Sequence, residues 1–115
     1  MGALEGSILR YLWSADRAVT PGEVLEAIDA DVAYTTVMTV LARLWQKGTV
    51  KRERQGRAYA YRPAVSAAEY AADRMQSALG RSVDRTATLA QFVDNLSARD
   101  ALALRRILTE LEGNP

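Results

Sequence analysis

Residues 33–62 read AYTTVMTVLARLWQKGTVKRERQGRAYAYR, and they carry the signals of a helix, a helix stop and a basic hairpin. From Thr36 onward, apolar residues recur at the i, i+3, i+4, i+7 spacing of a buried helical stripe. These residues are Val37, Val40, Leu41 and Leu44. The opposite side of the same helix is mainly polar and carries Thr35, Thr39, Arg43 and Gln46. We therefore expect a helix that buries one face and presents the other outward.

The helix is expected to stop at Gly48, where a left-handed residue would end it, and Lys47 suits the negative end of the helix dipole. Two short runs with strand-like composition follow, at residues 50–53 and 58–61. The segment Arg54-Gln55-Gly56-Arg57 between them supplies the glycine that a tight turn needs. The sequence therefore predicts a β-hairpin with a basic tip.

Positive charge is concentrated in the segment of residues 43–62. Its only acidic residue is Glu53, and its seven basic residues are Arg43, Lys47, Lys51, Arg52, Arg54, Arg57 and Arg62. The segment carries a formal charge of +6, whereas the whole chain carries +1, so the remainder sums to −5. A local basic surface on one structural unit favours phosphate binding, which the average charge conceals.

Two helices are expected before this unit. Leu4, Ile8 and Leu12 have the spacing of a first amphipathic helix. Thr20-Pro21-Gly22-Glu23 is a capping box with proline at the first helical position, and it predicts a short second helix that ends near Asp29. A helix-turn-helix followed by a hairpin is a winged helix. The sequence thus predicts a mainly α fold with a winged helix-turn-helix DNA-binding domain over residues 1–65.

Residues 66–115 are predicted to form a C-terminal helical dimerisation region. Capping signatures at Ser66 and Ser97 each open a helix, and a further helix is expected between them. The apolar positions of the last two helices are Leu89, Phe92, Val93, Leu104, Ile107, Leu108 and Leu111. These faces would pack either on the first domain or on a second chain. We favour a homodimer, because a single winged helix covers few base pairs and paired half-sites raise affinity.

Composition excludes several functional classes. The chain has no cysteine and no histidine, so thiolate or imidazole metal sites and the usual nucleophiles and bases are missing. No nucleophile, phosphate loop or ligand cluster accompanies the carboxylates, so we expect no enzyme activity, no metal and no cofactor. No signal peptide and no apolar run near 18 residues is found, which predicts a cytoplasmic protein without membrane association.

The chain resembles the penicillinase-repressor (BlaI/MecI) family of winged-helix transcriptional regulators. The resemblance is strong over residues 4–65 and weak over the helical tail. It rests on motifs in the family's order and spacing: Leu12-Trp13, Val19-Thr20, Glu23-Val24-Leu25, Tyr34-Thr35-Thr36-Val37-Met38-Thr39, Leu41-Ala42-Arg43-Leu44, Lys47-Gly48, Gly56-Arg57-Ala58 and Tyr61-Arg62-Pro63. It implies a dimeric repressor that binds double-stranded DNA operators with TACA/TGTA inverted repeats, reading bases with the helix at Thr35 and clamping phosphates with the hairpin.

By motif position, the residues that face the operator are Thr35, Thr36, Thr39 and Arg43. Arginine can bind guanine O6 and N7 together, and threonine offers a hydroxyl and a methyl group, so Thr39 and Arg43 are expected to contact bases. Thr35 and Thr36 lie at a helix N-terminus, which favours phosphates. The remaining predicted DNA contacts are Gln46, Lys47, Arg52, Arg54 and Arg57.

Family members that sense β-lactams are inactivated when a membrane-bound sensor protease pathway cuts the dimerisation region, commonly at an Asn-Phe pair. This chain has Gln91-Phe92 at the corresponding place, which makes Gln91 and Phe92 a candidate proteolytic site. Phe92 also fits the apolar face of its own helix. Copper-responsive relatives carry a C-terminal cysteine cluster, which this chain lacks.

One alternative function stays open. Winged helices also serve as protein-interaction modules without sequence-specific DNA binding, and Arg43, Arg54 and Arg57 would then face solvent or an acidic partner. Aromatic residues pose a similar choice between stacking platforms for single strands and core residues, and we favour the core. These aromatic residues are Trp13, Trp45, Tyr59 and Tyr61.

Overall fold

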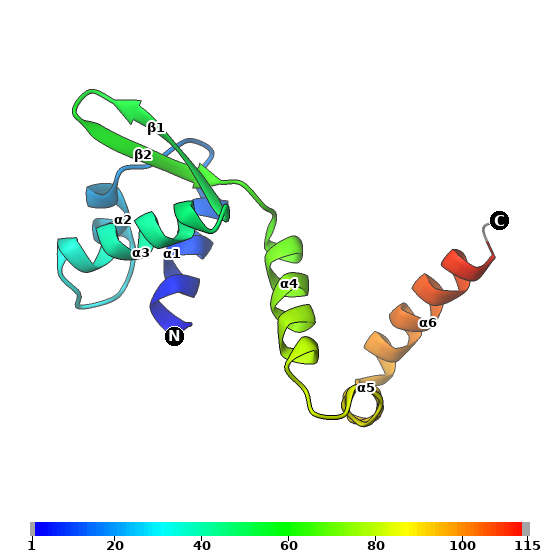
Figure 1. Ribbon diagram of the computed structural model, residues 1–115. Helices are drawn as coiled ribbons and strands as arrows, with labels where there is room; N and C mark the ends of the chain where they lie inside the picture. Colours follow the sequence, from blue (N-terminus) through cyan, green and yellow to red (C-terminus); the bar gives the residue numbers. More distant parts are fainter. Residues whose placement is uncertain (1, 114–115) are drawn as a thin grey trace. The chain divides into compact units, whose positions relative to one another are not determined.

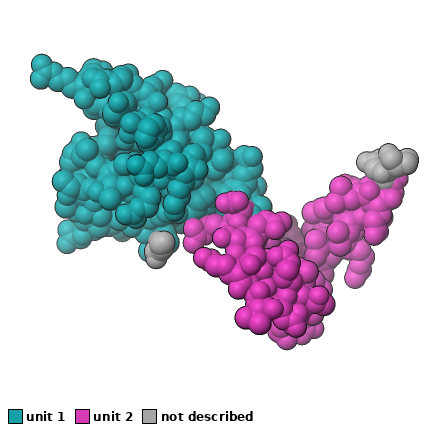
Figure 2. All heavy atoms as spheres, in the orientation of Figure 1, with its two compact units in different colours: residues 1–72 teal, residues 73–115 magenta. Residues whose placement is uncertain are grey.

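The computed structural model describes residues 2–113, which form six helices and one two-stranded sheet (Figure 1). Their order is α1 (Ala3–Ser14), α2 (Pro21–Ala27), α3 (Tyr34–Gln46), β1 (Val50–Gln55), β2 (Ala58–Pro63), α4 (Ala67–Gly80), α5 (Arg85–Asp94) and α6 (Ala98–Glu112). The chain divides into two compact units, residues 1–72 and residues 73–115 (Figure 2).

The first unit is built around one apolar core to which α1, α2, α3 and the hairpin all contribute. Its buried members are Ile8, Leu9, Leu12, Val19, Val24, Val37, Leu41, Leu44, Val50 and Tyr61. The predicted stripe of α3 is confirmed, although Val40 at its edge is only half-buried. Burying one large aliphatic side chain contributes about 1.5–3 kcal/mol, so the three buried residues of α3 hold that helix in one rotational setting.

The capping box at the start of α2 forms as expected. Thr20 Oγ1 accepts the backbone N–H of Glu23 at 3.3 Å, and Glu23 Oε1 accepts the backbone N–H of Thr20 at 2.9 Å. Arg17 adds an ion pair to the Glu23 carboxylate at 2.8 Å. These contacts satisfy N–H groups that a helix start leaves open, and they fix where α2 begins.

Gly48 ends α3 as predicted, because its φ of +82° lies in the left-handed region that other residues avoid. The chain folds back so that Thr49 N–H donates to the Leu44 carbonyl at 2.9 Å. Strand β1 follows after one further residue. The helix stop therefore sets the point from which the hairpin departs.

The hairpin β1–β2, which we call the wing, is antiparallel and is longer than predicted. Its register pairs Arg54 with Tyr59 and Gln55 with Ala58, which leaves Gly56 and Arg57 as a two-residue turn. Gly56 has a φ of +66°, the conformation that two-residue hairpin turns require at their first position. The sequence predicts Arg54 in the turn, and that prediction is wrong. Because the turn has only two residues, Arg54 belongs to strand β1 instead.

The base of the wing is bonded to the segment between α1 and α2. Val19 and Tyr61 exchange both backbone hydrogen bonds, at 2.9 and 2.7 Å. Ala64 N–H donates to the Thr49 carbonyl at 2.9 Å, which continues the pairing of the two strands by one residue pair at the base. In Figure 1 the wing lies against the cluster of α1, α2 and α3. The bonds between Val19 and Tyr61 attach it there.

The start of α4 is fastened to α1 within the first unit. Trp13 Nε1–H donates to the Val65 carbonyl at 3.0 Å, and the Trp13 ring meets the Tyr70 ring edge-on at 5.7 Å. The Tyr70 hydroxyl in turn donates to the Glu5 carboxylate. These contacts connect the last residues of the wing domain to the first turns of α4. The boundary at residue 65 stays a prediction.

The second unit contains the remainder of α4 with α5 and α6. Asp84 caps α5 by accepting the Ala87 N–H at 3.1 Å, and Ser97 caps α6 by accepting the Asp100 N–H at 3.0 Å. The capping signature at Ser97 is therefore confirmed. No residue of α4, α5 or α6 is buried. Within residues 2–113, no helix is both long enough and apolar enough to cross a membrane.

The capping box makes the stability of the chain depend on pH through Glu23. The hydrogen bond from the Thr20 N–H, followed by the contacts from Arg17, holds the pKa of this carboxyl below its ordinary value of 4.5. A lowered folded pKa stabilises the fold above the ordinary value, and that contribution is lost as pH falls through the folded value. We expect Glu23→Gln to flatten the loss of thermal stability below about pH 5, measured by circular dichroism.

Glu26→Gln is the matched control, because Glu26 is an exposed glutamate of the same helix outside the capping box. Its melting profile should follow that of the unchanged chain. If Glu23→Gln and the unchanged chain lose the same thermal stability as the pH falls, the role given to the capping box is contradicted.

Candidate nucleic-acid interface

The outward face of α3 collects the helix residues predicted to contact DNA. Burial of Val37, Leu41 and Leu44 turns the opposite side of the helix to solvent. All of the predicted contacts on α3 and at its C-cap are exposed: Thr35, Thr36, Thr39, Arg43, Gln46 and Lys47. The helix therefore presents a polar strip that runs from its first turn to its end.

The N-terminus of α3 is open to an anion. Its N-cap is Ala33, and no side chain among the described residues caps this end. Free first-turn N–H groups carry the partial positive charge of the helix dipole. Thr35 and Thr36 lie in this first turn, and their exposed hydroxyls add donors beside the backbone. The geometry suits a phosphate oxygen.

Thr39 lies one turn further along the strip, and its hydroxyl is already used as a donor. Thr39 Oγ1 donates to the Thr35 carbonyl at 2.9 Å. The oxygen can then only accept from an outside group, while the methyl group stays available for apolar contact. This limits the base edges that Thr39 can contact to an amino group or a thymine methyl.

The basic residues of the strip and the wing keep their charges available. Within residues 2–113, none of the arginines or lysines at positions 43, 47, 54 and 57 forms an ion pair with a carboxylate. All four are exposed. Unpaired, exposed guanidinium and ammonium groups are the groups that neutralise DNA phosphates. The predicted basic surface is therefore present and uncompensated.

Arg52 differs from these residues. Its guanidinium carbon lies 3.6 Å from the centre of the Trp45 ring and 4.1 Å from that of Tyr59. The side chain is half-buried. Arg54, two residues further along the same face of β1, is exposed and lies 5.4 Å from the Tyr59 ring. The two wing arginines thus have different surroundings.

The core interpretation of the aromatic residues holds only in part. Tyr61 is buried and Trp13 is half-buried, but Trp45 is 41% exposed and Tyr59 is 36% exposed. The interpretation is wrong for Trp45 and Tyr59, which pack against Arg52. A signal was present in the sequence, because Trp45 directly follows Leu44 and so lies well off the centre of the buried stripe.

The predicted dimerisation residues lie on α5 and α6 with their side chains largely uncovered. Exposure is 47% for Leu89, 45% for Phe92 and 51% for Val93 on α5. On α6, Ile107 and Leu108 are 55% and 51% exposed, Leu111 is 70% exposed, and Leu104 is half-buried. The predicted proteolytic pair Gln91-Phe92 lies inside α5 and both side chains are exposed.

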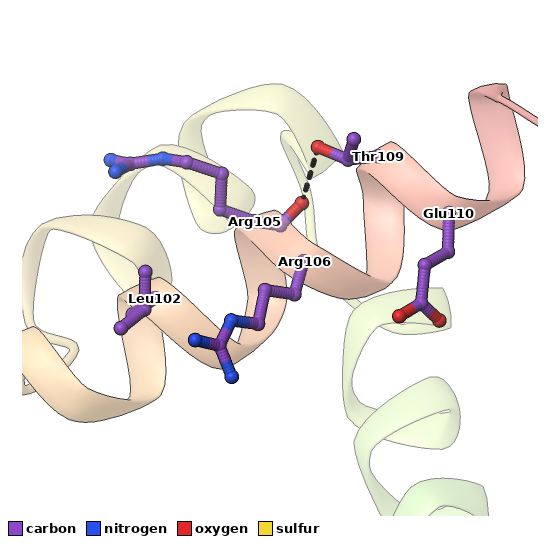
Figure 3. Close-up of a pocket in the computed structure, with 5 residues that line it drawn as sticks. All are labelled: Leu102, Arg105, Arg106, Thr109 and Glu110. Carbon is purple, nitrogen blue, oxygen red and sulfur yellow. Dashed lines mark hydrogen bonds between the residues drawn. The ribbon is translucent and has the colours of Figure 1, made fainter.

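One shallow hollow lies on α6. Figure 3 shows its lining, and all five residues belong to this single helix: Leu102, Arg105, Arg106, Thr109 and Glu110. Thr109 Oγ1 donates to the Arg105 carbonyl at 2.8 Å, which is a bond within the helix. In the described part of the chain, no group of three or more carboxylate, thiol or imidazole residues is arranged to hold a metal ion.

Comparison with known proteins agrees with this geometry. The family model described as penicillinase repressor matches residues 1–110. The chain belongs to the penicillinase-repressor family. It is 44% identical over 117 aligned positions to the transcriptional regulator BlaI of Mycobacterium tuberculosis, covering 97% of this chain and 85% of that protein. It is 25% identical over 112 positions to the penicillinase repressor of Bacillus licheniformis, covering 92% and 87% of the two chains.

Membership in the penicillinase-repressor family confirms the predicted class of protein. The chain is a transcriptional repressor of this family and not an enzyme, and the family implies operator DNA as its partner. The mainly helical winged-helix fold with C-terminal helices is confirmed as well. A solved structure from Archaeoglobus fulgidus shares the fold alone, with a TM-score of 0.51 and 13% identity over 73% of this chain and 92% of that one.

Proposed function

We propose that the chain is a homodimeric repressor that binds inverted-repeat operators of the TACA/TGTA type. Each subunit lays α3 in a major groove and sets the wing beside the flanking backbone. The observation that carries this proposal is the polar strip of α3 next to an uncompensated basic wing, both on one compact unit. A helix with an exposed polar face fits the major groove, and the wing charge fits phosphates.

Base reading is assigned to Thr39 and Arg43. A TACA/TGTA half-site contains one G·C pair, and a free arginine guanidinium binds guanine O6 and N7 with two hydrogen bonds. Arg43 has the exposure and the unpaired charge for this contact. Thr39 can present its methyl group to thymine or accept from an amino group, since its own proton is bonded to Thr35. Gln46, one turn beyond Arg43, extends the same strip.

Phosphate binding is assigned to both ends of α3 and to the wing. Thr35 offers its hydroxyl and its backbone N–H at the open helix start, and Thr36 offers its hydroxyl, since its N–H donates to the Ala33 carbonyl at 3.0 Å. Lys47 offers an ammonium group at the other end. Arg54 and Arg57 project from the outer part of the wing. Contacts of this kind position the helix and make affinity depend on salt without reading sequence.

Homodimer formation is assigned to the apolar faces of α5 and α6. Six of the seven apolar residues on these faces are between 45% and 70% exposed in the single chain, and apolar residues exposed together on one face mark interaction sites. Two-fold pairing of these faces would bury Leu89, Val93, Ile107, Leu108 and Leu111 together with Phe92 and Leu104. Such a pair would present two copies of α3 to two half-sites.

Release of the operator by proteolysis is assigned to the Gln91–Phe92 bond, with a sensor protease pathway as the partner. The bond lies within α5, where the Asn95 N–H donates to the Gln91 carbonyl at 3.2 Å. A protease would therefore cut it after local unwinding of α5. Cleavage would separate α6 from the DNA-binding unit and so remove part of the dimer interface.

The operator proposal is tested by titrating a fluorescent duplex with inverted TACA/TGTA half-sites, and a scrambled duplex, with the chain and with Arg43→Ala. The unchanged chain should prefer the operator. Arg43→Ala should lose about 1–3 kcal/mol of operator affinity, with little loss on the scrambled duplex, because a base contact is removed.

Arg10→Ala is the control, since Arg10 is an exposed arginine on α1 outside the interface. It should leave both affinities unchanged. An unaltered preference in Arg43→Ala would remove this residue from base reading. Equal, weak binding of the unchanged chain to both duplexes would favour the protein-interaction module instead.

The wing proposal predicts a different signature for Arg54→Ala and Arg57→Ala. Both should weaken binding to the two duplexes alike, because phosphate contacts carry no sequence information. The slope of log affinity against log salt concentration should fall by about one unit for each phosphate that the variant no longer neutralises. Lys51→Ala is the control, as Lys51 has the same charge on the opposite face of β1. A wild-type slope would exclude the mutated arginine from phosphate binding.

The dimer proposal predicts that Leu108→Asp separates the subunits, because it places a charge in an apolar interface. Sedimentation velocity should then give a monomer where the unchanged chain gives a dimer. Leu102→Asp, on the other side of the same helix, should leave the dimer intact. A dimer that survives Leu108→Asp, or an equal effect of Leu102→Asp, would move the interface elsewhere.

A further inference from the structure

We propose that Arg52 is a positioning residue, which holds the wing against α3 by stacking its guanidinium on Trp45 and Tyr59 and supports operator binding through these rings. This inference rests on the operator binding proposed above and concerns how the chain prepares its surface for DNA. It gives Arg52 a different role from the phosphate contact that its charge alone suggests.

The geometry places one arginine on two aromatic rings from different elements. Trp45 belongs to the last turn of α3, Tyr59 belongs to β2, and Arg52 comes from β1 between them. The guanidinium carbon lies 3.6 Å from the Trp45 ring centre and 4.1 Å from the Tyr59 ring centre. Both distances are well inside the range of about 6 Å at which a cation is attracted to a ring face. Arg52, on β1, therefore connects the end of α3 to β2.

Arg52 accounts for the placement of two rings that the core does not hold. Trp45 is 41% exposed and Tyr59 is 36% exposed, and neither belongs to the core. Arg52 itself is only half-buried in the same place. Covering a large aromatic surface that is exposed to water is energetically favourable. A planar guanidinium can cover such a ring while its own edge stays hydrated. The three side chains form one small cluster outside the core.

The position of this cluster lets it support the wing beyond the point where the backbone is attached. The wing is bonded to the rest of the unit at its base, through the backbone hydrogen bonds of Val19 with Tyr61. Beyond those bonds the wing is a pair of strands, and an isolated two-stranded hairpin has little stability of its own. Arg52 pairs with Tyr61 in the strand register and reaches from there to α3. The stack is thus an additional brace, which extends from the attached base of the wing outward to Tyr59.

Arg54 supplies an internal contrast. It lies on the same face of β1, but it is exposed and its guanidinium is 5.4 Å from the single ring of Tyr59. Arg54 can swing toward a phosphate at small cost, whereas Arg52 must leave two rings to do so. Two arginines with the same charge on one strand are therefore assigned different tasks, bracing for Arg52 and DNA contact for Arg54.

A braced wing helps binding because a surface that is already ordered loses less conformational entropy when the partner arrives. In the proposed complex, Arg54 and Arg57 reach the DNA backbone while α3 lies in the major groove. The position of the wing relative to α3 therefore matters for the phosphate contacts of both arginines. Loosening the stack should weaken all duplexes alike and leave the base preference of α3 unchanged.

The test is a double-mutant cycle with Arg52→Gln, Trp45→Leu and the combined variant, measured as operator affinity over a range of salt concentrations. Arg52→Gln should lower affinity roughly 2- to 30-fold, which is the range that such stacking contributes. In the Trp45→Leu background the same substitution should have no further effect. The salt slope should keep its wild-type value in both. Arg54→Gln is the contrast, since it should lower the slope and its effect should add to that of Trp45→Leu.

Arg52→Lys separates charge from stacking, because lysine keeps the charge and lacks the planar group that covers two rings. It should lose affinity as Arg52→Gln does. Wild-type affinity for Arg52→Lys, or an Arg52→Gln effect that persists without Trp45 and lowers the salt slope, would show that Arg52 binds a phosphate directly and would overturn the proposal.

The free protein gives a readout that needs no DNA. Ring currents of Trp45 and Tyr59 should shift the Arg52 side-chain proton signals upfield, and Trp45→Leu should remove most of that shift. Amide exchange in the outer wing should quicken in Arg52→Gln while exchange in the core stays unchanged. If no variant, including the unchanged chain, binds duplex DNA, the operator proposal fails. The stack itself is then decided by these two measurements, and normal shifts with unchanged exchange would overturn it.

Discussion

The burial of one stripe of α3 is the constraint on which the rest of the interface depends. Val37, Leu41 and Leu44 are packed into a core shared with α1 and α2, so the helix cannot rotate without exposing them. That fixed rotation turns Thr39 and Arg43 outward. The base contacts proposed for α3 need this rigidity, because a contact made by a rotating helix would lose its geometry.

The wing depends on α3 in two ways, through the chain and through side chains. The left-handed Gly48 ends the helix and returns the chain so that β1 begins three residues after Lys47. The stack of Arg52 on Trp45 and Tyr59 then adds a contact between the outer wing and the helix end. The basic residues and the contacts that hold the wing against α3 therefore lie on one unit. A surface that binds a DNA groove requires both.

Much of the winged-helix unit could be predicted from the sequence, because the sequence signals for its helices are local. Hydrophobic spacing gives the stripe of α3, and Thr20 with Glu23 gives the start of α2. The extra length of the strands and the surroundings of Arg52 were not predictable in the same way. Strand length depends on a turn that uses only Gly56 and Arg57, and the stack needs the cross-strand register and the end of α3 to be known together. The apolar faces of α5 and α6 were predictable as well, because their spacing is set within each helix.

We propose that α3 and the wing together form the surface that meets operator DNA. Two-dimensional NMR of the labelled chain, recorded with and without a duplex carrying inverted TACA/TGTA half-sites, tests it most directly. The largest amide shifts should fall on residues 35–47 and 54–57, with small shifts over α1. Shifts confined to α5 and α6, or spread evenly over the chain, would contradict it.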